Sequence, residues 1–285
     1  MRILVTGANG QLGSALQRLA PAFGHAFDFR DRATLDLCDG AAVRDHLART
    51  RPEAIINCAA YTAVDKAESD VDAARAVNVD AVAVVAKAAE AVGAHLVHVS
   101  TDYVYHNGLD RPLREDDPTT PQGVYAATKL EGERAALEAC AKTTIVRTSW
   151  VYGLEGHNFV RTMARLGAER ERLTVVSDQI GAPTFADDLA RACLRAIDLG
   201  DASHGETVNY AGEGVASWYD FARAIMRTYG RACEVAPIPS ADYPTPAARP
   251  TYSVLDLGKA RRLGLGTRHW RDALADFARL DATRA

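Results

Sequence analysis

The sequence predicts an α/β fold, in which a doubly wound parallel sheet lies between two layers of helices. Two observations carry this prediction. Short apolar segments rich in Val, Ile and Leu alternate with helical patterns over the first 150 residues, as in consecutive βα units. These segments are apolar on both faces, which indicates strands covered by helices on both sides of the sheet. Right-handed crossovers between parallel strands then give a doubly wound arrangement.

The first part of the chain contains strands and helices in regular alternation. The expected strands are Arg2–Thr6, Ala26–Phe29, Ala54–Asn57, His95–Ser100 and Thr143–Arg147. The expected helices are Gln11–Leu19, a helix capped by Asp39 that ends near Thr50, Ala67–Asn78, Asp80–Val92 and Tyr125–Cys140. Asp is a favourable N-cap because its carboxylate accepts hydrogen bonds from the free N–H groups of the first turn.

After residue 150 the alternation loosens, which predicts a smaller second lobe. Here the expected elements are a helix over Asn158–Glu169, a strand over Leu173–Ser177, a helix over Phe185–Leu199 capped by Thr184, and a helix over Trp218–Tyr229 capped by Ser217. Residues 237–250 hold five of the eleven prolines and predict a long stiff loop. We expect a sheet domain over residues 1–150 with a returning segment near 178–200, and a lobe made mainly of residues 151–285.

Composition excludes several classes of protein. The 285 residues are 48% hydrophobic and 25% charged, with a formal net charge of −4, so binding nucleic acid through bulk positive charge is not expected. No apolar stretch approaches the length of a membrane helix, about 20 residues. The sequence MRILVTGANG does not resemble a secretory signal peptide.

The cysteines indicate a reducing compartment. Five cysteines form an odd, scattered set without a C-x-x-C pair: Cys38, Cys58, Cys140, Cys193 and Cys233. Such a set predicts reduced thiols rather than disulfides or a zinc site. We therefore expect a cytoplasmic protein that does not interact with membranes.

A glycine-rich turn follows the first strand. Gly7, Gly10 and Gly13 form G-x-x-G-x-x-G directly before the first helix. In a dinucleotide-binding fold the first glycine permits the tight turn, the second lets the backbone approach a pyrophosphate, and the third lets the helix pack closely. The helix N-terminus offers free N–H groups to the phosphates. This position in the chain predicts a Rossmann-type site for NAD or NADP.

The residues at the end of the second strand do not distinguish NAD from NADP. A carboxylate there binds the adenosine ribose 2′-OH, whereas an arginine accommodates a 2′-phosphate. Asp28, Asp31 and Asp36 stand beside Arg30 and Arg32 in this segment. The arginines favour NADPH slightly, and NADH stays an alternative.

Tyr125 and Lys129 form Y-x-x-x-K in a helical pattern, so both side chains lie on one face. A free tyrosine has a pKa of about 10. A neighbouring ammonium and a nicotinamide ring favour the phenolate, so we expect a lowered pKa and a general acid or base for a carbonyl/alcohol couple. Thr101 follows the strand ending at Ser100, at the sheet edge where such folds bind ligands. Its hydroxyl is positioned to hold a substrate carbonyl against Tyr125.

Together these motifs resemble the extended short-chain dehydrogenases/reductases, and among them the dTDP-4-dehydrorhamnose reductase family. The resemblance runs from end to end of the chain. The stretches that carry it are residues 5–13 (VTGANGQLG), 57–68 (NCAAYTAVDKAE), 100–105 (STDYVY), 147–152 (RTSWVY), 178–184 (DQIGAPT) and 243–250 (YPTPAARP). Of these, TAVDKAE, DQIGAPT and YPTPAARP are far more specific than the superfamily motifs.

The resemblance implies a reaction and its site residues. NADPH or NADH would reduce the C4 ketone of dTDP-6-deoxy-L-lyxo-4-hexulose to dTDP-L-rhamnose, for cell-surface polysaccharides such as lipopolysaccharide O-antigen. Tyr125 would donate the proton, Lys129 would grip the nicotinamide ribose, and Thr101 would hold the ketone. In the cofactor site, the pyrophosphate would contact Gly10, Gln11 and Leu12, and the adenine would contact Asp36 and Leu37. The middle of the cofactor would lie along Ala60, Tyr61 and Thr62. Asp102 and Trp150 would face the sugar.

The remaining implications concern the second lobe, metal and partners. We assign Arg249 to the substrate diphosphate because a guanidinium suits bidentate phosphate contact. Some relatives are described as Mg²⁺-dependent, with one metal carboxylate early in the first helix. Ser14, Ala15 and Leu16 supply none there, so no metal site is expected. The expected partner is the dTDP-sugar, and a homodimer is an open option.

Three other functions are compared with this one: a sugar-nucleotide dehydratase or epimerase, a regulatory subunit, and a reductase for another dTDP-sugar. Sugar-nucleotide dehydratases of this superfamily usually carry Asp-Glu after the strand-end threonine, whereas Asp102-Tyr103 follows here, which favours plain reduction. A non-catalytic, dinucleotide-binding regulator, such as the subunit that modulates methionine adenosyltransferase, shares the fold. The intact Thr101, Tyr125 and Lys129 argue against it without excluding it. A 4-ketoreductase for another dTDP-sugar is also open, because the sequence does not fix the sugar's stereochemistry.

Overall fold

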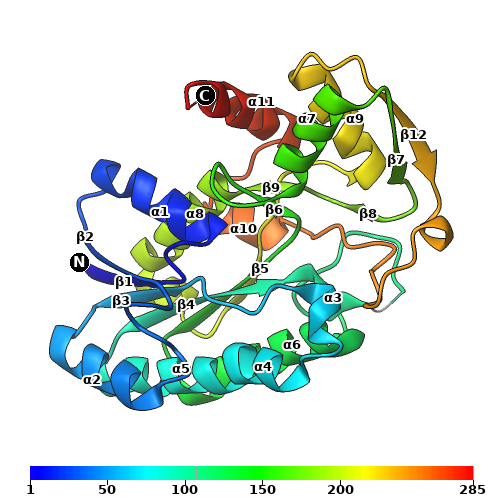
Figure 1. The fold of residues 1–285 in the computed structure, drawn as a ribbon. Coiled ribbons are helices and arrows are strands. Elements are labelled where there is room, and N and C mark those ends of the chain that lie inside the picture. The colour runs from blue at the N-terminus through cyan, green and yellow to red at the C-terminus, as the bar shows by residue number, and fades with distance from the viewer. Residues whose placement is uncertain (107, 285) are drawn as a thin grey trace.

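The centre of the structure is a six-stranded sheet with the strand order β10-β5-β4-β3-β1-β2 (Figure 1). The structure is a computed structural model and describes residues 1–106 and 108–284. The strands are β1 Arg2–Thr6, β2 Ala26–Arg30, β3 Ala54–Asn57, β4 His95–Thr101, β5 Thr143–Thr148 and β10 Thr207–Asn209. All neighbouring pairs are parallel. The predicted doubly wound α/β fold is confirmed, and β10 is a strand that the sequence analysis did not include.

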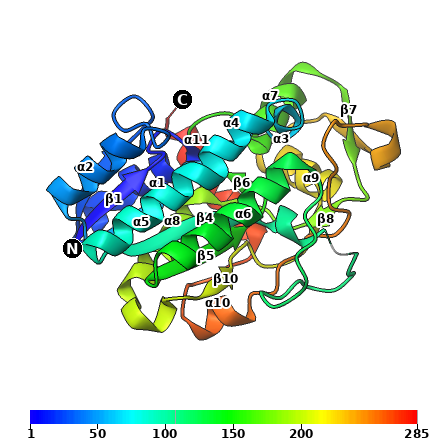
Figure 2. The ribbon, with the colours of Figure 1, turned by 90° about the horizontal axis from the view of Figure 1, so that it is seen from below.

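Two layers of helices cover the sheet (Figures 1 and 2). One layer contains α1 Gln11–Leu19, α8 Ala186–Asp198 and α10 Gly258–Arg262; the other contains α2 Gly40–Thr50, α5 Ala81–Val92 and α6 Gly123–Ala139. Successive strand residues face opposite layers. Ile3 and Val5 belong to the core on the α1 and α8 side, whereas Leu4 belongs to the core beneath α2 and α5. None of the described helices is long and apolar enough to cross a membrane.

The strand order reverses beside β1. The chain leaves β1 for β2 on one side and then returns to β3 on the other side. The loops after β1 and β3 therefore diverge and leave a crevice at the carboxyl ends of the strands, where ligands of doubly wound folds bind. The glycine-rich turn after β1 lies at this point.

A second apolar core forms apart from the sheet. It lies among α7 Phe159–Glu169, α9 Trp218–Thr228 and α11 Trp270–Ala282, beside the parallel strands β7 Arg172–Val176 and β12 Glu234–Ile238. Short pairs connect it to the rest of the chain: β6 Val151–Tyr152 with β9 Thr184–Phe185, and β8 Ile180–Gly181 with β11 Ala216–Ser217. Residues 186–198 return to the sheet as α8. The division of the chain at residue 150 stays a prediction.

Two of the three predicted helix caps are confirmed. Asp39 accepts hydrogen bonds from the backbone N–H groups of Ala41 and Ala42. Ser217 forms a reciprocal capping box with Asp220. The third prediction is wrong: Thr184 lies in β9, and α8 begins at Ala186 without a side-chain cap. The short strand pair with β6 takes Thr184 out of the cap position.

The predicted helix over Ala67–Asn78 is wrong in both bounds. A short helix, α3, covers Val64–Ala67, and α4 begins only at Val71 and ends at Arg75. A π-helical segment, η2 (Ala76–Asp80), then joins α4 to α5 without a break. Within it the buried Asn78 hydrogen-bonds the backbone of Tyr61 and the hydroxyl of Thr128 on α6. The irregular turn thus ties the Tyr61 segment to α6, a tertiary role that helical periodicity does not reveal.

The proline-rich loop is also more ordered than predicted. Its start, including Pro237, belongs to β12, and Ser240–Asp242 forms a short 3₁₀ helix. Ser240 is held by the carboxylate of Asp178. The prolines from Pro244 onward lie outside helices and strands.

A buried ion pair anchors α6 to the sheet. Arg147 on β5 donates to the carboxylate of Glu133 on α6 at 3.0 and 2.7 Å, and to the hydroxyl of Tyr105 at 2.6 Å. The side chains of Arg147 and Glu133 are only 7% and 2% exposed. Because α6 also carries Tyr125 and Lys129, this pair fixes the helix that supplies the catalytic candidates.

We predict that Glu133→Ala lowers the free energy of unfolding by about 3–5 kcal/mol, because it leaves the Arg147 guanidinium buried without its counter-charge. The matched control is Glu131→Ala on the same helix, which breaks the exposed pair with Arg75 and leaves the stability nearly unchanged. Urea unfolding monitored by circular dichroism measures both. Equal effects of the two substitutions would contradict the anchoring role.

Candidate active site

A cavity of about 840 Å³ runs along the carboxyl ends of β1, β3, β4 and β5 toward the second lobe. Its size is typical of small-molecule and cofactor sites. Arg249, and the candidates Asp28 and Arg30 of β2, do not line this cavity. The other residues predicted for the site do: Gly7, Gly10, Gln11, Leu12, Gly13, Arg32, Asp36, Leu37, Ala60, Tyr61, Thr62, Thr101, Asp102, Tyr125, Lys129 and Trp150. The fold therefore brings together residues that are far apart in the sequence.

The glycine-rich turn fits tightly against the start of the loop after β3. Gly7 has a φ of +66°, and a Cβ there would lie 2.7 Å from the backbone nitrogen of Ala59. A Cβ on Gly13 would lie 2.3 Å from the carbonyl oxygen of Gly7. Helix α1 begins at Gln11, and no side chain caps it. The turn thus aims the open N-terminus of α1 into the cavity, an arrangement that fits a pyrophosphate.

The structure distinguishes among the acidic residues at the end of β2 that could bind the adenosine ribose. Asp31 lines the cavity, while its carboxylate accepts hydrogen bonds from the side chains of Asn9 and Thr34. These hydrogen bonds, chiefly those with Thr34, lower the pKa of Asp31. Asp28 instead binds His46 on α2 and lies outside the lining. The Arg32 side chain is 88% exposed, with Nε 3.8 Å from the Asp36 carboxylate, so it is free to reorient toward a ligand.

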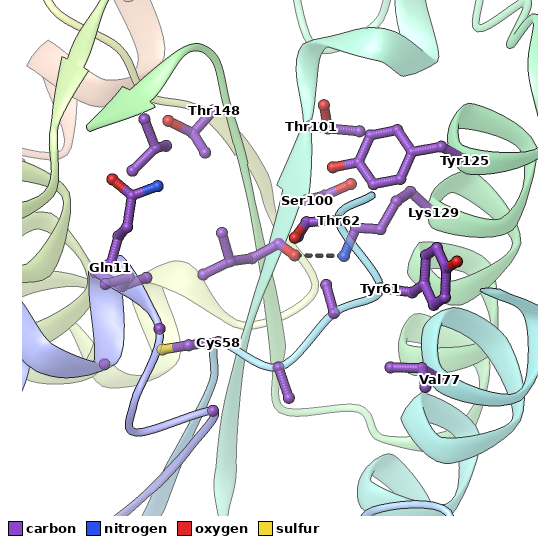
Figure 3. A pocket seen from close by; sticks show the side chains of 18 of the residues that line it. Gln11, Cys58, Tyr61, Thr62, Val77, Ser100, Thr101, Tyr125, Lys129 and Thr148 are labelled. Atoms are coloured by element: carbon purple, nitrogen blue, oxygen red, sulfur yellow. Dashed lines mark hydrogen bonds between the residues drawn. The ribbon is translucent and has the colours of Figure 1, made fainter. Parts of the chain in front are cut away.

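Tyr125 and Lys129 occupy one face of α6, and both point into the cavity (Figure 3). The Tyr125 ring lies beside Thr101 at the end of β4 and packs edge-on against Tyr103, with ring centroids 5.6 Å apart. Burial raises the pKa of Tyr125 to about 12, and hydrogen bonding to Thr101 offsets only part of this rise. At neutral pH the phenol is therefore protonated.

Lys129 is buried and directed at strand β4. Its Nζ donates a hydrogen bond to the carbonyl oxygen of Val99 at 2.8 Å and lies 3.5 Å from Nε2 of His98. Burial lowers the pKa of Lys129 to about 8, while the nearby Glu133 carboxylate acts in the opposite direction. The sequence analysis expects a lowered pKa for Tyr125 beside Lys129 and a nicotinamide ring. Without a nicotinamide the pKa is raised, because burial of the phenol dominates and Lys129 is engaged with β4.

Several buried polar atoms of the lining lack a hydrogen-bond partner among the described residues. They are Gln11 Oε1, Ser100 Oγ, Asp102 Oδ2 and Thr148 Oγ1. Burial raises the pKa of Asp102 to about 6, although its other oxygen accepts a hydrogen bond from Thr101. Unpaired buried polar atoms are rare in native proteins. Four such atoms line this one cavity, beside a helix N-terminus, and this arrangement fits a polar ligand such as a dinucleotide with a sugar nucleotide.

Trp218 lines the cavity, whereas the sequence analysis placed it only at the start of a helix and not in the site. Its indole stacks on that of Trp150, with ring centroids 3.7 Å apart and planes 11° apart, and both line the cavity. Trp150 has a φ of +47°, which is strained for a bulky side chain. Trp150 follows β5 and Trp218 begins α9, so the stack joins the sheet to the second lobe. The only feature of the sequence that marks Trp218 is its position directly after the helix cap Ser217, and it belongs to none of the motifs.

Arg249 lies next to the site without lining it. Its guanidinium binds the Asp65 carboxylate on α3 at 2.8 Å and lies 6.0 Å from the centre of the Tyr103 ring. This contact joins the segment of residues 62–68 to that of residues 243–250, two of the most specific stretches of the sequence. The predicted contact of Arg249 with a diphosphate stays a prediction.

Two further observations concern metals and thiols. Among residues 1–106 and 108–284, no group of three or more His, Cys, Asp or Glu side chains is arranged to hold a metal ion. All five cysteines are free, and Cys38 and Cys58 line the cavity.

Known proteins resemble this chain over its whole length. The profile of the RmlD substrate binding domain family matches residues 1–282. A dTDP-4-dehydrorhamnose reductase of Streptomyces griseus is 45% identical and covers 96% of this chain and 92% of its own length. A crystal structure of a dTDP-4-dehydrorhamnose reductase from Clostridium acetobutylicum has a TM-score of 0.94 at 41% identity and covers 100% of both chains.

A further solved structure, of a dTDP-4-dehydrorhamnose reductase from Bacillus anthracis in complex with NADP, has a TM-score of 0.92 at 38% identity and covers 97% of this chain and 98% of its own. Sequence motifs, fold and full-length similarity agree. This chain belongs to the dTDP-4-dehydrorhamnose reductase family.

Proposed function

We propose that the protein reduces the C4 ketone of dTDP-6-deoxy-L-lyxo-4-hexulose to dTDP-L-rhamnose, with NADPH or NADH as the reductant. The observation that carries this proposal is the position of Tyr125, Thr101 and Lys129 in one cavity with the glycine-rich turn. Membership of the dTDP-4-dehydrorhamnose reductase family supports the substrate. The reductase named in complex with NADP supports a nicotinamide dinucleotide.

The residues divide the work of carbonyl reduction. A bound reduced nicotinamide supplies a hydride to C4. Tyr125 donates a proton to the ketone oxygen, which is otherwise left as an alkoxide. The high pKa of Tyr125, about 12, keeps the phenol protonated at neutral pH. An alkoxide is a far stronger base than a phenolate, so the transfer of this proton is still downhill. Thr101 holds the ketone oxygen near the phenol.

Other residues bind and orient the two ligands. The backbone from Gly10 to Leu12 receives the pyrophosphate, and the segment from Ala60 to Thr62 lies along the middle of the cofactor. Lys129 grips the nicotinamide ribose. Asp102 and the Trp150–Trp218 stack face the sugar, where the buried carboxylate accepts hydrogen bonds from hydroxyl groups and the indoles cover the apolar face of the deoxysugar.

We also propose a cytoplasmic location and a role in making rhamnose for surface polysaccharides. The free cysteines suit a reducing compartment. A homodimer is compatible with this proposal and is tested by light scattering.

The direct test is the loss of absorbance at 340 nm when dTDP-4-keto-6-deoxyglucose is added with NADPH or with NADH. The proposal predicts oxidation only when the 3,5-epimerase is also present. Oxidation without the epimerase would indicate a reductase for another dTDP-sugar. Cofactor binding without oxidation would favour a regulatory subunit.

We predict that Tyr125→Phe lowers kcat by about 10²- to 10⁴-fold, the usual contribution of a positioned general acid. The dissociation constant for NADPH stays within about twofold, because the phenol acts in proton transfer rather than in dinucleotide binding. Steady-state kinetics and fluorescence titration measure these quantities. Tyr243→Phe, at a largely exposed tyrosine outside the cavity lining, is the control. A parallel loss of cofactor affinity and turnover would contradict the role of Tyr125.

A second prediction concerns the adenosine end. If Arg32 binds a 2′-phosphate, Arg32→Ala raises the KM for NADPH by about 10- to 100-fold, as expected for a lost charge-assisted hydrogen bond, and leaves the KM for NADH nearly unchanged. Arg44→Ala, on the exposed side of α2, is the control. Equal changes for both cofactors would remove Arg32 from the account of cofactor preference.

A further inference from the structure

A chain of buried polar side chains runs from the end of β1 to Lys129. The hydroxyl of Thr6 donates to Asn57 Oδ1 at 2.6 Å, and Asn57 Nδ2 lies 3.1 Å from His98 Nδ1. On its other side, His98 Nε2 lies 3.5 Å from Lys129 Nζ. Each of these side chains is at most 2% exposed. The chain crosses β1, β3 and β4 beneath the cavity and ends on α6.

The backbone fixes the orientation of the Asn57 amide. The N–H of Ala59 points at Asn57 Oδ1, with a nitrogen–oxygen distance of 3.3 Å. A backbone N–H can only donate, so the atom that faces it must be the amide oxygen. The amide nitrogen of Asn57 therefore faces His98 and donates to it.

This orientation determines the tautomer of His98. Since Asn57 donates to Nδ1, that nitrogen carries no proton, and the proton of the neutral ring lies on Nε2. Burial and the charge of Lys129 both lower the pKa of His98 well below its usual value, so the doubly protonated ring is disfavoured. The imidazole thus presents an N–H to Lys129.

An N–H directed at Lys129 affects its protonation. An ammonium has three donors and no acceptor, whereas a neutral amine has a lone pair that accepts a hydrogen bond. The Nζ already donates to the Val99 carbonyl oxygen. Tyr125 lines the same cavity as Lys129, and the Glu133 carboxylate on α6, which is held by Arg147, acts on the pKa of Lys129. Glu133 favours the ammonium, whereas the N–H of His98 favours the amine.

We propose that Asn57 locks His98 in its Nε2–H tautomer, and that His98 acts as a positioning residue that holds Lys129 against β4 and biases it toward the neutral amine. The catalytic significance of this arrangement rests on the proposed function, in which Lys129 binds the cofactor beside Tyr125. This series of polar side chains begins at Thr6, next to the contact of Gly7 with Ala59. It therefore connects the glycine-rich turn to Lys129.

The test uses NMR of the cofactor-free protein. The chain has five lysines, Lys66, Lys87, Lys129, Lys142 and Lys259, so ¹³Cε-lysine labelling gives few signals, and Lys129→Arg assigns the relevant one. The ¹⁵N shifts of His98 report its tautomer in the unaltered protein. We expect a proton on Nε2 and a Lys129 midpoint well below that of an ordinary lysine, about 10.4. A proton on Nδ1 would overturn the proposal without any substitution.

Asn57→Asp reverses the donor at Nδ1. The carboxylate accepts from His98 Nδ1–H, which leaves Nε2 as an acceptor for the ammonium, and we expect the Lys129 midpoint to rise by about one pH unit or more. The pH profile of kcat/KM moves in the same direction. A rise of the midpoint without a change of tautomer would mean that the new carboxylate acts through its charge alone, and would overturn the proposal.

His98→Gln and His95→Gln complete the design. Glutamine at position 98 keeps an amide oxygen for Asn57 and an N–H for Lys129, so the low midpoint is retained. His95 lies on the same strand with its ring on the opposite face, bonded to Thr144, and its substitution leaves the Lys129 midpoint unchanged. A raised midpoint for both variants would show that the packing of β4, and not the N–H of His98, sets the Lys129 midpoint, and would overturn the proposal. These titrations need no turnover. If NADPH were not oxidised, the proposed function would fail, whereas the titrations would still test the tautomer of His98 and the protonation of Lys129.

Discussion

The contact between the turn after β1 and the start of the loop after β3 is the constraint on which the rest of the site depends. Only a glycine at position 7 combines the left-handed backbone with the close approach to Ala59. That contact sets the direction of α1, whose N-terminus opens into the cavity. It also positions the N–H of Ala59, which orients the Asn57 amide. Asn57 in turn contacts His98, and His98 contacts Lys129. In the proposed function, one tightly packed backbone crossing thus connects the residues that bind the cofactor with those that carry the acid–base chemistry.

The substrate side of the cavity is built differently. Here the sheet domain and the second lobe meet through side chains: Trp150 stacks on Trp218, and Arg249 pairs with Asp65. The Trp150 backbone is strained, and such strain persists only where the surroundings hold it in place. The hydrogen bond from Thr184 N–H to the Trp150 carbonyl oxygen contributes to this support. The specific sequence stretches of the family therefore join the sheet to the second lobe at this end of the cavity.

Local patterns predicted most of the sheet domain because each βα unit carries its own signals. Apolar runs located the five strands, and Gly7, Tyr125 and Lys129 marked the strand and helix ends that meet at the carboxyl edge. The sequence could not indicate β10, which is too short to show a period, or the π-helical turn at Asn78, whose reason is a contact with α6. The high pKa of Tyr125 and the engagement of Lys129 with Val99 depend on burial, and no motif encodes burial. Trp218 was missed because its partner, Trp150, is distant in the sequence.

The central claim is that the carboxyl edge of this sheet brings a reduced nicotinamide and the C4 ketone of a dTDP-sugar together, with Tyr125 as the acid. The most direct measurement follows the hydride itself. NADPH deuterated at either transferable position of its nicotinamide is supplied with the epimerised substrate, and the product is analysed by NMR. The account predicts dTDP-L-rhamnose with deuterium at C4 from one of the two labelled cofactors. Deuterium at another carbon, a product epimeric at C4, or no label from either cofactor would contradict it.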